Sequence, residues 1–173
     1  TGMKPAFPEP GEVVLNEMLP EPGPGGSRFA ELLNLSSKAF DLRDMAIAVC
    51  MPDENPESVP VIPLASEPFQ LLPLEYAAAC ESSEEIEDSY SPRYPARLIT
   101  VEDFPSLPDG PVSLILSRTA DGQVLDRVDY SLEMHHPLLS STEGVSLERV
   151  NPYGPSCDPS NWQSAASSAG FAT

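Results

Sequence analysis

Proline and glycine recur along the whole chain and limit the folds it can adopt. Twenty-one prolines and ten glycines are spread over 173 residues. Proline lacks a backbone donor and breaks helices, and clusters of proline and glycine mark turns. The distribution therefore excludes long helices and predicts many short strands joined by turns. Hydrophobic residues make up 40% of the chain, enough to form a core. We predict an all-β, sandwich-type module.

Apolar runs with strand-like alternation recur at intervals that support this prediction. The proline-interrupted runs among them, 61–64 and 69–72, are predicted edge strands. Asp121-Gly122 predicts a hairpin turn between two of the longest runs. The predicted strands are Glu12–Leu19, Arg28–Leu35, a short segment from Phe40 to Leu42, Met45–Met51, Val61–Leu64, Phe69–Leu72, Glu75–Cys80, Val112–Leu116, Val124–Tyr130 and, as the last strand, Val145–Val150.

The stretches between these runs are predicted to be largely irregular. Glu81–Asp88 is expected to be a solvated loop, and the chain from there to Gly110 has no regular pattern. Asn161–Ala169 is predicted to hold one helical turn, which Asn161 caps and Gly170 ends.

The charge of the chain bears on its partners. Nine basic and twenty-seven acidic residues give a formal charge of −18 and a pI near 4.1. Such a surface repels phosphate backbones and anionic lipids, so nucleic acid and membrane surfaces are disfavoured as partners. It suits solubility outside the cell, or a partner that carries cations. No apolar run approaches the roughly 18 residues of a transmembrane helix, so the chain is not expected to be membrane-inserted.

Two parts of the sequence resemble the tail domain of lamins. Residues 11–19 (GEVVLNEML), 29–34 (FAELLN) and 40–42 (FDL) are similar to the opening of that family, and 122–130 (GQVLDRVDY) to its closing hairpin. Met45 departs from the family, which often has a tryptophan there. The resemblance implies an immunoglobulin-like β-sandwich in which certain residues form a structural motif: Asn16, Glu17, Glu31, Asn34, Asp126 and Tyr130.

The C-terminal part resembles, more narrowly, the lamin-tail-like domains of bacterial secreted or envelope proteins. The segments that carry this resemblance are 134–139 (MHHPLL), 144–149 (GVSLER) and 161–166 (NWQSAA). It implies a single domain over residues 11–173 with a C-terminal extension at 131–173, preceded by a linker at 1–10 from an upstream region. The structural motif then also includes His135, His136, Glu148, Arg149 and Trp162. Because the sequence starts at Thr-Gly with Met3 inside it, we expect a fragment of a longer extracellular or cell-envelope protein. Thr1 to Pro10 itself lacks an apolar signal sequence.

Glu17 and Glu31 are the candidate catalytic pair. If their strands are neighbours, the two carboxylates have the chemistry of a glycosidase. Glu31 shares a strand face with Phe29 and Leu33, so partial burial and a raised pKa are expected for it. The alternative, which we favour, is that both glutamates, with Asn16 and Asn34, hydrogen-bond loops and turns at one end of the sandwich.

Three other groups of residues each have a ligand-binding and a structural interpretation. His135 and His136 point apart on an extended chain, so a zinc site needs Cys157 or Asp129 as well, and a structural or surface role is favoured. Trp162 is a sugar-stacking platform or, as we favour, an anchor for the C-terminal segment. Glu148 and Arg149 are adjacent, so they are expected to face opposite sides of a strand and to have separate partners.

Two acidic stretches and the cysteines complete the candidates. Residues 52–57 and 81–88 offer oxygen ligands for weak calcium binding, but neither has the spacing of an EF-hand, and plain solvated loops are favoured. Cys50 and Cys80 end predicted strands. They form a disulfide if those ends meet, or, as we favour, they are small buried apolar residues.

No nucleophile, metalloprotease, phosphate-loop or dinucleotide motif is present in the sequence. We therefore predict a protein that is not an enzyme and has no cofactor: an interaction or scaffolding module of a larger secreted or cell-surface bacterial protein. Its partners would be neighbouring domains or another protein. The alternatives are a carbohydrate- or calcium-dependent adhesion module, with a glycan as partner, and a hydrolase that uses Glu17 and Glu31.

Overall fold

The computed structural model of the chain describes residues 5–166, and strands dominate that part. Its regular elements are many short strands, five short 3₁₀ turns (η1–η5) and one α-helix, α1 (Ser83–Tyr90). The strands are β1 (Val13–Leu19), β2 (Phe29–Asn34), β3 (Phe40–Asp41), β4 (Met45–Cys50), β5 (Ile62–Pro63), β6 (Gln70–Leu71), β7 (Tyr76–Cys80), β8 (Leu98–Thr100), β9 (Val112–Arg118), β10 (Val124–Tyr130), β11 (Leu147–Arg149) and β12 (Trp162–Ser164).

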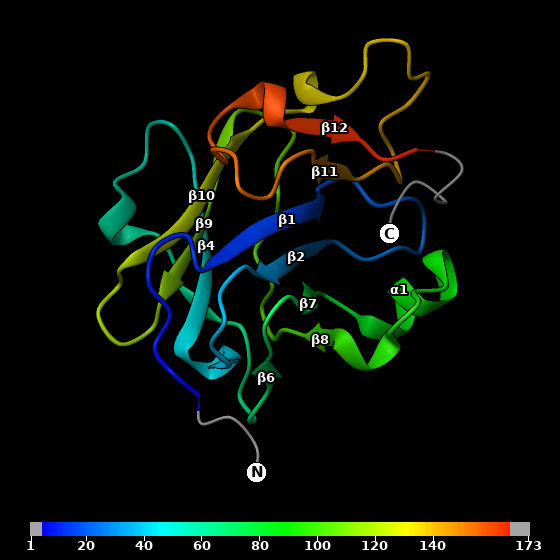
Figure 1. The fold of residues 1–173 in the computed structure, drawn as a ribbon. Helices are drawn as coiled ribbons and strands as arrows, with labels where there is room; N and C mark the ends of the chain where they lie inside the picture. Colours follow the sequence, from blue (N-terminus) through cyan, green and yellow to red (C-terminus); the bar gives the residue numbers. More distant parts are fainter. Residues whose placement is uncertain (1–4, 167–173) are drawn as a thin grey trace.

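The strands form two main sheets and one short pair (Figure 1). One sheet has six strands in the order β12-β11-β1-β2-β7-β8, and the other has four in the order β10-β9-β4-β5. β3 and β6 form the pair. Neighbouring strands are antiparallel except β7 and β8, which are parallel. The prediction of an all-β fold is confirmed at this level.

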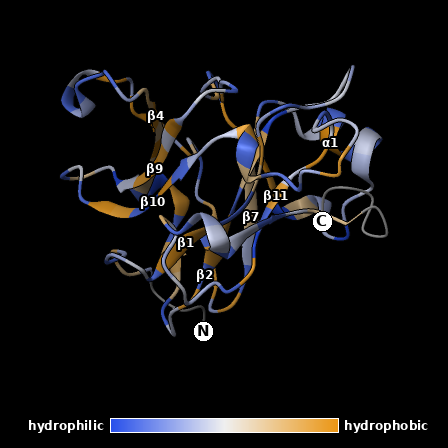
Figure 2. Ribbon diagram, turned by 90° about the horizontal axis from the view of Figure 1, so that it is seen from above, coloured by the Kyte–Doolittle hydropathy of each residue, from blue (hydrophilic) through white to orange (hydrophobic). Residues whose placement is uncertain are grey.

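A single large core lies between the two main sheets, and the hydrophobic residues, orange in Figure 2, lie along their strands. Leu15 and Leu32 come to it from the six-stranded sheet, and Ile47 and Leu114 from the four-stranded sheet. Burial of each such side chain stabilises the fold by roughly 1.5–3 kcal/mol. Tyr130 is fully buried at the end of β10, and its hydroxyl donates to the carbonyl of Pro108 at 3.0 Å.

The predicted hairpin and edge strands are confirmed. β9 and β10 pair across a turn in which Gly122 has a φ of +72°, the left-handed conformation that favours glycine. β5 is the outer strand of its sheet, and β6 pairs only with β3 in the described part.

The prediction of a loop at 81–88 is wrong, because most of it is the first part of α1. The Ser82 hydroxyl caps the helix by accepting from the amide of Glu85, and Ile86 anchors it on a small cluster with Leu19 and Phe29. The helix ends at Ser91, which adopts a left-handed conformation. Farther along, the supposedly irregular stretch contains β8.

The prediction of a helical turn at 161–169 is also wrong within the described part. A 3₁₀ turn ends at Asn161, and the chain then forms strand β12, so Val145–Val150 does not contain the last strand. Pairing with β11 prevails over local helix propensity because it places Trp162 in the core. Residues 167–169 of this prediction lie outside the described residues.

The segment predicted as a linker contacts the domain over its described residues. Ala6 forms a parallel bridge to Phe40, and the carbonyl of Pro8 accepts from Arg118 at 3.0 Å.

Cys50 and Cys80 lie in different sheets, and both are buried free thiols, which confirms the prediction of small apolar residues in place of a disulfide. In residues 5–166, no helix is long and apolar enough to cross a membrane.

Candidate functional site

Three glutamates line up across adjacent strands of the six-stranded sheet. Glu17 of β1 lies opposite Glu31 of β2 on one side and Glu148 of β11 on the other. Ala30 and Leu32 point into the core, so alternation places Glu31 on the outer face of the sheet. Directly opposed side chains have Cβ atoms only about 4.5–5.5 Å apart. We call Glu148, Glu17 and Glu31 the carboxylate row.

The carboxylate row creates an electrostatic cost that falls mainly on Glu31. Burial, and after it the neighbouring carboxylates of Glu17 and Glu148, raise the pKa of Glu31 to about 8, against a lowering by the hydrogen bond from Asn16. The raised pKa predicted for Glu31 is therefore found. Its predicted position on the same strand face as Phe29 and Leu33 is found as well. At pH 7 the side chain of Glu31 is mostly a neutral acid that donates as well as accepts hydrogen bonds.

Asn16 reaches Glu31 because β1 contains an irregularity there. The pairing of β1 with β2 shifts between Leu15 and Glu17, which leaves Asn16 as the extra residue of a bulge. Its side-chain amide donates to Oε1 of Glu31 at 2.9 Å. Asn34, at the end of β2, has a different role: its amide donates to the carbonyls of Lys38 and Leu71 and so holds the following turn.

A pocket of about 680 Å³ opens beside Glu31 on this outer face. Its small floor residues, Ala77 and Ala78, belong to β7. The side chains of Tyr76 and Tyr94 are 46% and 62% exposed at its walls. We call this the Glu31 pocket; its remaining lining residues are Asn16, Leu74, Glu75, Pro92, Arg93, Arg97 and Leu98.

The basic side chains at the Glu31 pocket are engaged elsewhere. Arg97 pairs with Glu75 at 2.9 Å and donates to the carbonyl of Tyr76, while Arg93 lies over the ring of Tyr94. In the part of the chain that the structure describes, no lysine or arginine forms an ion pair with Glu31 or Glu148. The charges that act on Glu31 are therefore mainly those of Glu17 and Glu148, which raise its pKa.

Glu17 and Glu31 do oppose each other, as the glycosidase interpretation requires, but they are not equally accessible. Glu17 is 1% exposed and accepts a hydrogen bond from the Ser146 hydroxyl at 2.6 Å. A glycosidase offers both carboxylates to one sugar. Here only Glu31 borders the pocket.

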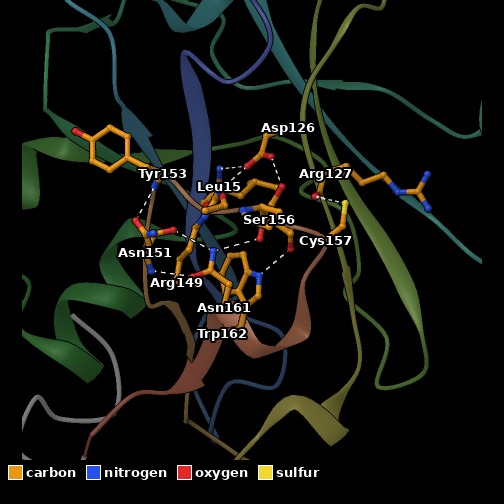
Figure 3. A network of polar contacts seen from close by, with 12 residues as sticks. Leu15, Asp126, Arg127, Arg149, Asn151, Tyr153, Ser156, Cys157, Asn161 and Trp162 are labelled. Atoms are coloured by element: carbon orange, nitrogen blue, oxygen red, sulfur yellow. Dashed lines mark hydrogen bonds and ion pairs between the residues drawn. The ribbon is translucent and has the colours of Figure 1, made fainter.

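A second polar cluster joins the C-terminal extension to the main sheets (Figure 3). The Asp126 carboxylate accepts from the amide of Leu15 at 2.8 Å, from Arg149 at 2.9 Å and from the Ser156 hydroxyl. Arg149 also donates to the carbonyls of Leu15 and Gly154. Arg149 faces inward and Glu148 outward, so the prediction that they face opposite sides of the strand is confirmed.

Trp162 is an anchor in this cluster. It is 4% exposed, its indole N–H donates to the carbonyl of Ser156 at 2.9 Å, and its ring lies near the guanidinium of Arg149. A buried ring cannot stack on a sugar, so the platform interpretation of this residue is wrong.

His135 and His136 point apart, as predicted. His135 is buried, with Nδ1 3.0 Å from the Ser164 hydroxyl, and His136 is exposed. Neither contacts the suggested zinc partners: Cys157 donates to the carbonyl of Arg127, and Asp129 pairs with the Arg127 side chain. Within residues 5–166, no group of three His, Cys, Asp or Glu side chains is arranged to hold a metal ion, and this includes both acidic stretches.

Sequence reasoning missed the tyrosines of the Glu31 pocket. Tyr76 and Tyr94 come from separate segments, and no local pattern links them to Glu31.

Comparison of the chain with protein-family models gives no match, and comparison with curated proteins gives none either.

Proposed function

We propose that this chain is a non-catalytic interaction module of a larger secreted or cell-surface bacterial protein, with an immunoglobulin-like sandwich of the lamin-tail type. In this proposal its Glu31 pocket receives a basic side chain of a partner protein. The observation that carries the proposal is that the carboxylate row lies beside a pocket. Two members of the row, Glu31 and Glu148, form no ion pair with any of residues 5–166.

Electrostatics favour a cation as the bound group. Bringing an ammonium or guanidinium group next to Glu31 offsets the repulsion from Glu17 and Glu148 and allows Glu31 to ionise. The ring of Tyr76 offers a face for cation–π contact, worth roughly 0.5–2 kcal/mol. The formal charge of −18 attracts a basic partner over longer distances.

The size of the pocket agrees with a single inserted side chain. About 680 Å³ is within the roughly 300–1,000 Å³ of pockets for small ligands. The small side chain of Ala78 leaves room above β7 for an aliphatic stem, and Leu74 and Pro92 add apolar wall. Lysine and arginine have this combination of an apolar stem and a charged end.

A carbohydrate ligand is the second candidate, now supported at a different place from Trp162. Exposed Tyr76 and Tyr94 beside the amide of Asn16 combine ring faces with planar polar groups. A neutral sugar would bind Glu31 as the protonated acid, whereas a basic side chain would bind the carboxylate. The two candidates therefore differ in the direction of their pH dependence.

The test uses the peptide acetyl-Gly-Gly-Lys-Gly-Gly-amide and its counterpart with norleucine in place of lysine. Titration followed by NMR at pH 8 should shift the amides of Tyr76 and Ala78 with the lysine peptide only. Glu31→Gln should abolish the shifts, and Glu84→Gln, the same charge change on exposed α1, should leave them unchanged. Equal shifts with the norleucine peptide, or with Glu31→Gln, would reject the proposal. Shifts with methyl glycosides alone would favour the second candidate.

A further inference from the structure

A larger groove lies far along the chain from the Glu31 pocket, between β10 and the C-terminal extension. Its volume is about 1390 Å³. One wall includes Arg127, Asp129 and Tyr130 of β10, and the other includes residues 162–166. Ser131, residues 133–137 and Leu139 border it as well. We call it the extension groove.

Both walls of the extension groove contain a strand at the edge of its sheet. In the described part of the chain, β10 pairs only with β9, and β12 pairs only with β11. Asn161 and Ala165 make their main-chain bonds to Val150 and Ser146, on the β11 side. By the alternation of an antiparallel ladder, the main-chain amide and carbonyl of Ser164 point away from β11.

One wall also contains a buried polar atom that lacks a partner. His135 is 6% exposed, and its Nε2 has no hydrogen-bond partner among the described residues. Burial lowers the pKa of His135, which keeps the ring neutral at pH 7. An unsatisfied buried group of this kind costs roughly 1–3 kcal/mol. This wall therefore contains one buried nitrogen, His135 Nε2, without a hydrogen-bond partner among the described residues.

The charged side chains along the groove are Arg127, Asp129 and Glu133, and the first two cancel each other. Arg127 pairs with Asp129 at 2.7 Å and donates to the hydroxyl of Ser113, which itself donates to Asp129. Elsewhere the surface is strongly acidic, with a formal charge of −18 for the chain. The groove is thus suited to an uncharged occupant, unlike the Glu31 pocket.

We infer that the extension groove binds an extended, uncharged polypeptide segment of a partner protein. The volume exceeds the roughly 300–1,000 Å³ of small-molecule pockets, which favours a polymer. The acidic surface disfavours nucleic acid as that polymer. Main-chain groups of an extended segment match the outward main chain of Ser164, as when a peptide adds to a sheet edge.

The test selects binders from a phage-displayed library of random dodecapeptides, with counter-selection on Ala166→Trp. Ala166 is exposed at the groove, so its replacement fills the groove without disturbing the core. Ala120→Trp, at an exposed position in the β9–β10 turn outside the groove, is the matched control. Thermal unfolding of both variants checks that they fold.

The selected peptides should be poor in charged residues and bind Ala166→Trp at least tenfold more weakly than wild type. Ala120→Trp and Glu31→Gln should bind them as wild type does. Unchanged binding by Glu31→Gln shows that the peptides do not bind at the Glu31 pocket. Binding should slow hydrogen exchange at the Ser164 amide and shift the ¹⁵N resonance of His135 Nε2. The inference is overturned if no peptide is enriched, or if Ala166→Trp binds equally well. It is also overturned if wild type is a dimer that Ala166→Trp makes monomeric, because a second copy would then be the occupant.

Discussion

The carboxylate of Asp126 lies 2.9 Å from Nη1 of Arg149, and both side chains are more than nine-tenths buried. The pair joins β10 of the four-stranded sheet to β11 of the six-stranded sheet. Because Asp126 also accepts from the Leu15 amide and the Ser156 hydroxyl, one carboxylate connects β1, β10 and the C-terminal extension.

Asp126→Ala should be strongly destabilising. It leaves a buried guanidinium without its counter-charge and a buried amide without its acceptor, and breaking such pairs costs about 3–5 kcal/mol. Urea unfolding followed by circular dichroism measures the change. Asp129→Ala removes the half-exposed ion pair with Arg127 and should cost less than about 1 kcal/mol. Equal losses in the two variants would contradict the assigned role of Asp126.

Trp162 should report the docking of the extension, since it is the single tryptophan of the chain. Its burial predicts blue-shifted emission and weak quenching by acrylamide in the native protein. Trp162→Phe removes the hydrogen bond to Ser156, so a loss of about 1–2 kcal/mol in unfolding free energy is expected. Strong quenching of the native protein would show that the extension is not docked in this way.

The three cysteines should differ in reactivity. Cys157 is exposed, whereas Cys50 and Cys80 are buried, and burial raises the pKa of Cys80 to about 11. A thiol reagent at pH 7.5 should therefore label one site in the native protein and three in denaturant, as counted by mass spectrometry. Two sites unreactive even in denaturant without reductant would indicate a disulfide.

Glu31→Gln should change how stability depends on pH. Between about pH 4.5 and pH 8 the folded state keeps a proton on Glu31 that the unfolded state has released, so this group makes stability fall as pH rises. The slope approaches roughly 1.4 kcal/mol per pH unit within that window.

The difference in unfolding free energy between Glu31→Gln and wild type isolates this group, because His135 and the other titrating residues are common to both. We expect the variant to gain stability relative to wild type from pH 5 to pH 8, with urea unfolding as the measurement. A difference that stays constant over this range would mean that Glu31 has an ordinary pKa.

Local pattern was sufficient to predict much of the fold. Asp121-Gly122 identified the hairpin, and alternation in 29–34 grouped Glu31 with Phe29 and Leu33 on one face of the strand. The structure shows that this face is the one away from the main core. The capping pair Ser82 and Glu85 was a readable helix signal within a stretch whose acidity suggested a loop. Strand β12 had no such signal, since its conformation depends on pairing with β11, a tertiary contact.

The candidate site was predictable only in part for the same reason. The opposition of Glu17 and Glu31 follows once two neighbouring strands are recognised, because register then brings them together. Glu148 joins them from a strand 131 residues after Glu17, and Tyr94 enters the pocket from an irregular segment before η3 (Pro95–Arg97). Nothing in the spacing of these residues indicates their meeting.

The most direct test of the proposed function is the affinity of the lysine peptide measured at several values of pH. If the ammonium group binds ionised Glu31, whose pKa in the free protein is about 8, affinity should rise about tenfold from pH 6 to pH 7, about fivefold from pH 7 to pH 8, and then level off. NMR titration gives the dissociation constant at each pH. Affinity in wild type that is independent of pH, or the same rise in Glu31→Gln, would contradict recognition of a basic side chain by Glu31.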